Sequence, residues 1–105
     1  MARLALFIKT KTQPGKRQEV RTLWEEHLKA RAEANEAQQV VAFCEDDQDP
    51  DTFYLFEIYR DREAFQQNAA QPWFGEYMTK VGPLLAGQPE VGMATPAWSK
   101  GLAGS

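Results

Sequence analysis

Residues 52–77, "TFYLFEIYRDREAFQQNAAQPWFGEY", decide the fold because they join the most β-prone run of the chain to a helix-forming segment. Residues 52–60 place apolar side chains on both alternating faces, which indicates a strand. Asp61 stands where a helix N-cap is expected, and Pro72 where a second helix would open. The stretch therefore predicts a strand followed by a pair of helices, residues 61–71 and 72–87.

The flanking segments complete the order of elements. Apolar patterning predicts a strand over residues 3–12 and then a long amphipathic helix, residues 13–37, that opens at a Pro-Gly turn. It also predicts a strand over residues 38–46, before the polar turn 47–51, and a last strand over residues 88–96, before a loose tail of residues 97–105. The order of strand, helix, strand, strand, helix pair and strand is that of the ferredoxin-like βαββαβ fold, an α+β class with an antiparallel sheet. We expect one domain, residues 1–96, followed by the tail.

The sheet predicts a partner. One face of residues 52–60 carries Phe53, Leu55, Glu57 and Tyr59, and the opposite face is also largely apolar. The helices of so short a chain can cover only one face, and a bare apolar face of several hundred Å² is unusual for a monomer. The sequence therefore predicts a homodimer joined through the faces of its sheets.

Composition excludes several classes of function. The 105 residues carry a net charge of −3 with no basic cluster and no long apolar run, so we expect neither a nucleic-acid partner nor a membrane. The N-terminal apolar run is too short for a signal peptide, and the single cysteine forms no internal disulfide, which favours a cytoplasmic protein. One histidine and one cysteine do not make the usual zinc or iron site, and no glycine-rich phosphate loop is present.

Three quoted segments carry a resemblance: "PGKRQEVRTLW" (14–24), "DPDTFYLFEIYRDREAFQQNAAQPWFGEY" (49–77) and "PLL" (83–85). Together they resemble the antibiotic biosynthesis monooxygenase family of the dimeric α/β-barrel superfamily, over roughly residues 3–96. That family includes oxygenases, small-molecule isomerases and haem-degrading enzymes. The resemblance implies a dimeric α/β barrel of ferredoxin-like protomers.

The resemblance also suggests which residues matter. Many members have histidine where Asn68 and Trp73 stand, whereas an asparagine and a tryptophan here are similar to those of cofactor-free oxygenases of aromatic polyketides, where such groups hold the substrate oxygens. The haem-degrading branch needs an axial histidine on the following helix, and no histidine follows His27. We therefore expect no cofactor, and in particular no haem.

The candidate catalytic residues are His27, Asn68 and Trp73. Asn68 offers an amide donor, Trp73 an indole N–H and a flat wall, and His27 is the natural general base. Each has a structural alternative, in which Asn68 caps the helix break, Trp73 packs in the core, and His27 is a buried histidine bonded to a carbonyl.

Four further residues carry expectations. The tyrosines Tyr54, Tyr59 and Tyr77 are candidate substrate-binding donors. Glu57, in the middle of an apolar strand, favours a structural ion pair, with Arg60, Arg3 or a backbone amide as its partner.

These features predict a cofactor-independent monooxygenase that oxidises a small electron-rich aromatic, such as an anthrone or a quinol, with O₂. The alternatives are a small-metabolite isomerase or lyase that uses His27 on the same scaffold, and a non-catalytic ligand-binding dimer.

Overall fold

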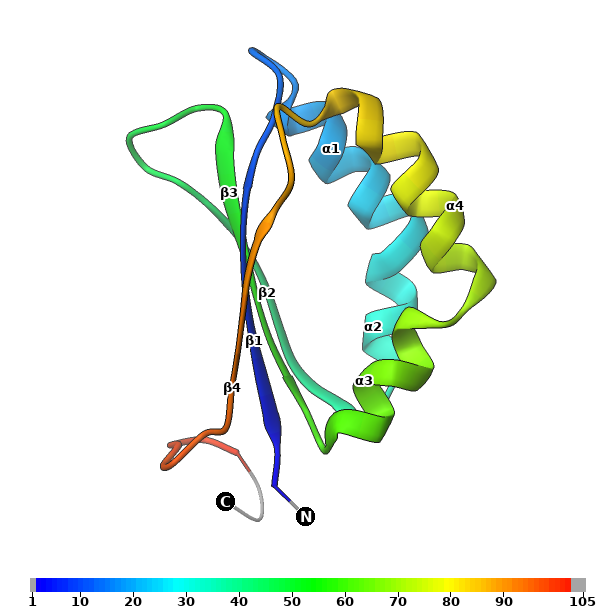
Figure 1. Ribbon diagram of the computed structural model, residues 1–105, viewed down its shortest axis with the longest axis vertical. Coiled ribbons are helices and arrows are strands. Elements are labelled where there is room, and N and C mark those ends of the chain that lie inside the picture. Colours follow the sequence, from blue (N-terminus) through cyan, green and yellow to red (C-terminus); the bar gives the residue numbers. More distant parts are fainter. Residues whose placement is uncertain (1, 103–105) are drawn as a thin grey trace.

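A computed structural model describes residues 2–102 and shows one sheet with helices on a single side (Figure 1). The elements are β1 (Leu4–Lys11), α1 (Arg17–Trp24), η1 (Glu25–Lys29), α2 (Ala30–Ala34), β2 (Gln38–Glu45), β3 (Thr52–Tyr59), α3 (Arg62–Ala69), α4 (Pro72–Val81), η2 (Gly82–Leu84) and β4 (Glu90–Ala94). The strand order is β2-β3-β1-β4, and each neighbouring pair is antiparallel. The predicted ferredoxin-like α+β fold is confirmed.

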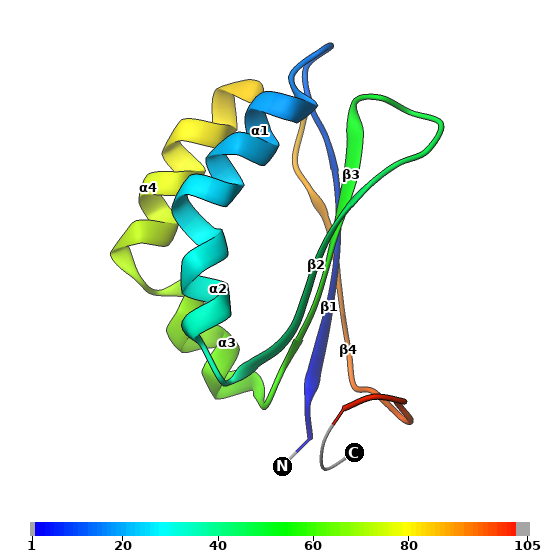
Figure 2. The same ribbon diagram turned by 180° about the vertical axis from the view of Figure 1, so that it is seen from behind.

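The predicted long helix is a continuous segment of three parts. It begins at Arg17, after a turn in which Gly15 has a φ of 77°, a conformation that favours glycine. The middle part, η1, is π-helical, and α1 and α2 flank it. This segment runs beside α4 along the sheet (Figure 2).

The second helical pair begins and breaks where the sequence predicts. The Asp61 carboxylate accepts a hydrogen bond from the Ala64 N–H at 2.8 Å and so caps α3. Pro72 opens α4 at its first turn, where its missing N–H costs nothing.

Strand pairing sorts the side chains into rows that cross the sheet. On the side of the helices, Glu57 lies between Val41 and Leu6, in a row that ends at Met93. On the opposite, open face, Phe56 lies between Ala42 and Phe7, in a row that ends at Gly92. Phe7 is 50% exposed although its ring lies 5.1 Å from that of Phe56. The open face is therefore apolar at its centre.

The buried core between sheet and helices is divided into two clusters. One, under α3, is built on Leu4, Leu6, Tyr59 and Ala64. The other, under α1 and α4, is built on Val20, Phe53, Tyr77 and Val81. This division leaves room between the clusters, and the site described below lies there.

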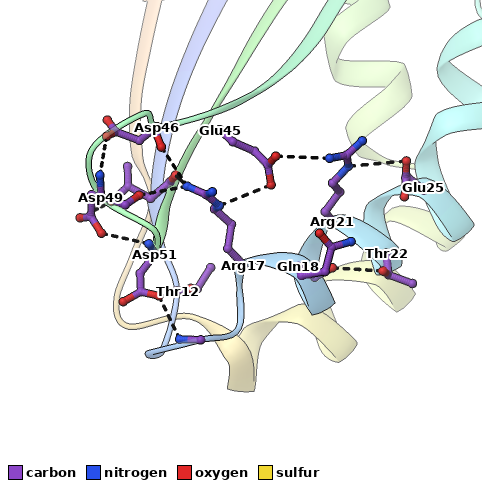
Figure 3. Close-up of polar contacts among 12 residues, drawn as sticks. Thr12, Arg17, Gln18, Arg21, Thr22, Glu25, Glu45, Asp46, Asp49 and Asp51 are labelled. Atoms are coloured by element: carbon purple, nitrogen blue, oxygen red, sulfur yellow. Dashed lines mark hydrogen bonds and ion pairs between the residues drawn. The ribbon is translucent and has the colours of Figure 1, made fainter.

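Arg17 ties the start of α1 to the turn between β2 and β3 (Figure 3). Its Nη1 donates to the carbonyl oxygens of Asp46, Asp49 and Thr52 at 3.1, 3.0 and 3.1 Å. Its Nε lies 3.4 Å from Oε2 of Glu45. Hydrogen bonds from the backbone N–H of Asp49 and the Tyr54 hydroxyl hold the pKa of Asp46 down to about 2, so this carboxylate stays charged in the turn.

Residues 95–102 contain no helix or strand and lie beyond β4, on the side of the open face (Figure 1). The last three residues of the predicted tail lie outside the described residues. Within residues 2–102 no helix has the length and apolar character needed to cross a membrane.

We expect Arg17→Met to destabilise the protein by about 1.5–3 kcal/mol, because three carbonyl oxygens lose a charged donor while the aliphatic stem is kept. The Arg17 side chain is only 20% exposed, so water replaces the guanidinium poorly. Chemical denaturation measures the free energy of unfolding. The matched control is Lys16→Met, which removes a pair with Glu19 at 47% exposure and should change stability by less than about 0.5 kcal/mol. Equal effects of the two substitutions would contradict the role of Arg17.

Candidate functional site

A cavity of about 280 Å³ lies between the sheet and the helices. Its wall is mainly aliphatic and aromatic, and side chains from both core clusters contribute to it. The wall side chains that carry a polar atom are Thr10, Trp24, Gln38, Glu57, Tyr59, Asn68, Trp73 and Tyr77. An apolar enclosure with a few convergent polar groups is the usual form of a small-molecule site.

The polar groups are connected through the Tyr59 hydroxyl. It donates to Oε1 of Glu57 at 2.8 Å and accepts from Nδ2 of Asn68 at 3.0 Å. Nε2 of Gln38 lies 2.9 Å from the same Glu57 oxygen and 3.0 Å from the Tyr59 hydroxyl. Oδ1 of Asn68 accepts from Nδ2 of Asn35 at 3.4 Å, which fixes the orientation of the amide. β2, β3 and α3 thus meet in one hydrogen-bond network.

A β-bulge brings Gln38 into this network. The pairing of β2 with β3 shifts between Gln38 and Val40, so Gln38 lies opposite Tyr59, where a regular ladder would place Gln39. The extra residue turns the Gln38 side chain toward the helices, and Gln39 instead accepts a hydrogen bond from Nε of Arg3.

Burial dominates the ionisation of the three acidic groups of the cavity. Burial raises the pKa of Glu57, and its hydrogen bonds from Tyr59 and Gln38 oppose part of that shift. Burial raises the pKa of Tyr59, and the charge of Glu57 raises it further. The same two causes, in the same order, raise the pKa of Tyr77 to about 12. Both tyrosines are therefore hydrogen-bond donors across the physiological range, and Glu57 is a stronger base than an exposed glutamate.

Trp73 forms part of the wall at the start of α4. The guanidinium of Arg31 lies 4.7 Å from its ring centroid, a cation–π contact that holds the indole from the outside. A second hollow, lined by Arg31, Asn35 and Gln71 among others, shares Asn68 and Trp73 with the cavity. Trp73 and Asn68 therefore separate the apolar cavity from a more polar recess.

Four of the six predicted site residues come together at this cavity: Asn68, Trp73, Tyr59 and Tyr77. The alternative that Asn68 caps the helix break is wrong, because its side chain bonds Tyr59 and Asn35. Their catalytic and binding roles stay predictions.

His27 does not line the cavity, although its ring centroid lies 6.5 Å from that of Tyr77. Its Nε2 lies 3.4 Å from Nζ of Lys80, on the seam between the first helical segment and α4. The reason is the π-helical turn, in which four residues nearly complete one turn and Leu28 follows Trp24 onto the inner face. In a regular α-helix His27, seven residues after Val20, would face the sheet instead.

Tyr54 also lies elsewhere. Its hydroxyl donates to Oδ2 of Asp46 at 2.7 Å, in the turn that Arg17 holds. It occupies the open face with Phe56, since β3 alternates, and so it serves the turn rather than the cavity.

Glu57 and Gln38 are two polar groups of the wall that the sequence analysis did not assign to the site. The expected ion pair of Glu57 is wrong, because its carboxylate bonds Tyr59 and Gln38, while Arg60 pairs with Asp61 at 3.6 Å and Arg3 bonds Gln39. The signal for Glu57 in the sequence is a carboxylate in the middle of an apolar strand, where burial is costly. Nothing in the sequence around Gln38 indicates that its side chain faces the cavity, because the alternation of apolar residues does not show where a β-bulge occurs.

Within residues 2–102 no three His, Cys, Asp or Glu side chains are grouped so that they could hold a metal ion.

Solved structures with the same architecture are numerous. Rv0793 from Mycobacterium tuberculosis is 23% identical, with a TM-score of 0.82 and coverage of 93% of this chain and 98% of that one. A candidate antibiotic biosynthesis monooxygenase from Caulobacter crescentus is 20% identical, with a TM-score of 0.85 and 92% of each chain covered. A second such candidate, from Nitrosomonas europaea, is 11% identical, with a TM-score of 0.86 and 95% of each chain covered. At these identities the likeness shows the fold alone.

None of the curated proteins matches the chain at significant similarity. The family model for antibiotic biosynthesis monooxygenase, however, matches residues 3–80, from the start of the sheet to the end of α4 and therefore across most of the cavity wall. The chain belongs to the antibiotic biosynthesis monooxygenase family.

Proposed function

We propose that the protein is a cofactor-independent monooxygenase that uses O₂ to oxidise a small, electron-rich aromatic of the anthrone or quinol type. The observation that carries the proposal is the largely apolar cavity with a few polar groups, among them the Asn68 amide bonded to the Tyr59 hydroxyl, in its wall. Its volume of about 280 Å³ is at the small end of ligand pockets, which favours a compact ring system.

The reaction needs three things from the protein. For an anthrone, the ring CH₂ loses a proton to give an enolate, and the enolate passes one electron to O₂. The resulting radical and superoxide combine into a peroxide, which takes up a proton and then loses water as the second C–H proton leaves. The CH₂ group and O₂ thus become C=O and H₂O, so no external reductant is needed. The site must therefore accept a proton, stabilise an oxyanion and exclude water.

Asn68 is the proposed oxyanion donor. One N–H of its amide binds the Tyr59 hydroxyl, and the other is available to a substrate oxygen. The bond from Asn35 holds the amide in place, so it need not reorganise as negative charge develops. Among residues 2–102 the Trp73 indole N–H has no acceptor of its own, which suits it to a second contact with the ligand.

We expect Asn68→Ala to lower kcat on the order of a hundredfold and to raise KM less, because a donor to the developing oxyanion acts mainly in the transition state. Trp73→Phe keeps the apolar wall and should cost less. O₂ consumption with dithranol, measured against buffer because anthrones autoxidise, gives both constants. The control is Gln67→Ala, also on α3, whose exposed amide bonds only Glu63.

Circular dichroism must show that each variant folds. A folded Asn68→Ala protein that works as fast as the parent would contradict the donor role. A parent that is no faster than buffer across several anthrones and quinols would overturn the oxygenase proposal in favour of an isomerase, a lyase or a ligand-binding protein.

The proposed enzyme is a homodimer joined through the open faces of its sheets. The row of Ala42, Phe56 and Phe7 gives this face an apolar centre, and the helices cover only the other side (Figure 1). A second copy would remove the half-exposed ring of Phe7 from water.

Light scattering is expected to give a mass of about 24 kDa for two chains of 11.9 kDa each. Phe7→Glu should shift the mass to that of a monomer, because it would bury a charge between the sheets. Gln66→Arg, on the exposed surface of α3, is the matched control and should remain dimeric. A parent that is monomeric at micromolar concentration would refute the dimer.

A further inference from the structure

Among residues 2–102 Glu57 is the one carboxylate of the cavity wall, and its two oxygens differ. Oε1 accepts hydrogen bonds from the Tyr59 hydroxyl and from Nε2 of Gln38. Among the described residues none donates to Oε2, and no buried side-chain nitrogen or oxygen in this part of the chain lacks a partner. Oε2 is therefore open to the cavity although the residue as a whole is only 8% exposed.

Among the residues that the structure describes, no Lys, Arg or His side chain lines the cavity beside this carboxylate. β2 contributes Gln38, α3 contributes Asn68, and the remaining titratable groups of the wall are Tyr59 on β3 and Tyr77 on α4. A buried carboxylate without a cation is costly, and packing gains nothing from it. In Glu57 one carboxylate oxygen accepts two hydrogen bonds and the other faces the cavity. This arrangement suits a general base better than a residue whose only role is to join strands.

We propose that Glu57 is the general base of the site, and that the cavity therefore catalyses enolisation of a carbonyl substrate even without O₂. In this step a C–H bond that is conjugated with the carbonyl through the ring breaks, and its proton forms a bond to Oε2 of Glu57. The electron pair moves through the ring onto the carbonyl oxygen, to which the free N–H of the Asn68 amide can donate. Return of the proton, or of a deuteron exchanged from solvent, completes a redox-neutral cycle.

This inference rests on the proposed function, because the enolate is the species that would reduce O₂. Proton transfer to Glu57 and reaction of the enolate with O₂ can be measured separately, because the first proceeds under nitrogen and the second does not. Tyr59 is a positioning residue in this scheme, because it holds Oε1 and leaves Oε2 to the substrate.

Stability gives a readout that is independent of turnover. The folded-state pKa of Glu57 is raised above its unfolded value, so ionisation costs more in the folded protein, and this penalty is absent below the unfolded pKa and complete above the folded one. Glu57→Gln removes the penalty and keeps an amide oxygen for the bond from Tyr59. Its melting temperature should exceed that of the parent at about pH 8, and the difference should shrink toward about pH 4. A variant less stable than the parent at every pH would show a structural role and overturn the inference.

The direct test is hydrogen–deuterium exchange at the CH₂ group of anthrone in D₂O under nitrogen, followed by NMR and corrected for buffer. The parent should exchange faster than buffer, with a rate that rises with pH through the raised pKa of Glu57 and then levels. Glu57→Gln should lose on the order of 10²–10⁴-fold of the enzymatic rate, and Glu57→Asp should lose less. Glu76→Gln, on the exposed surface of α4, is the matched control and should exchange like the parent.

A second variant keeps the test decisive if Glu57→Gln does not fold. Tyr59→Phe removes a hydrogen bond that lowers the pKa of Glu57, so the midpoint of the exchange profile should move to higher pH. An unmoved midpoint, or a folded Glu57→Gln protein that exchanges like the parent, would overturn Glu57 as the base. If exchange requires Glu57 but the parent consumes no O₂ in air, Glu57 is the base and the protein is not an oxygenase. If O₂ consumption survives Glu57→Gln, the protein is an oxygenase and Glu57 is not its base.

Discussion

The pairing of β3 with a strand on each side is the constraint on which the rest of the structure depends. β3 pairs with β1 and β2 along its length, so a slip of one position would send Glu57 and Tyr59 to the open face. In this register its inner side chains run from Phe53 and Leu55, which are apolar, to Glu57 and Tyr59, which are polar. The cavity above the strand therefore has an apolar end, at Phe53 and Leu55, and a polar end, at Glu57 and Tyr59.

The sequence predicted what depends on local patterning. Alternation in residues 52–60, the Asp61 cap and Pro72 were enough for the element order, and two of the residues singled out from the sequence, Asn68 and Trp73, both line the cavity. What failed depended on departures from ideal geometry. A π-helical turn moved His27 to the outside, and a bulge brought Gln38 inside. Each adds one residue to a regular repeat. The apolar periodicity of the sequence does not show at which helical turn or strand pair that extra residue is accommodated.

The cavity weakens the core. It separates the two apolar clusters, and its wall includes a carboxylate that would be more stable in water. The fold offsets this at the far end of the sheet, where one guanidinium bonds three carbonyl oxygens and pairs with Glu45 (Figure 3). The hydrogen bonds at the site offset only part of the desolvation of Glu57, whereas the charged Arg17 contacts lie away from the cavity. Such a division is common where activity needs an environment that folding alone would avoid.

The π-helical turn has a consequence for how relatives of this chain diverge. Loss of one residue from Glu25–Lys29 would let the segment wind as a regular α-helix, and the residues after it would keep their faces, because the π-helical turn accommodates one extra residue. Leu28 and Ala32 would therefore stay on the cavity wall. In a helix without such a turn, the same loss would rotate every later residue by about 100° about the helix axis and would exchange the side chains that face the cavity. The π-helical turn is thus the place where this segment can change its length and still leave the wall of the pocket intact.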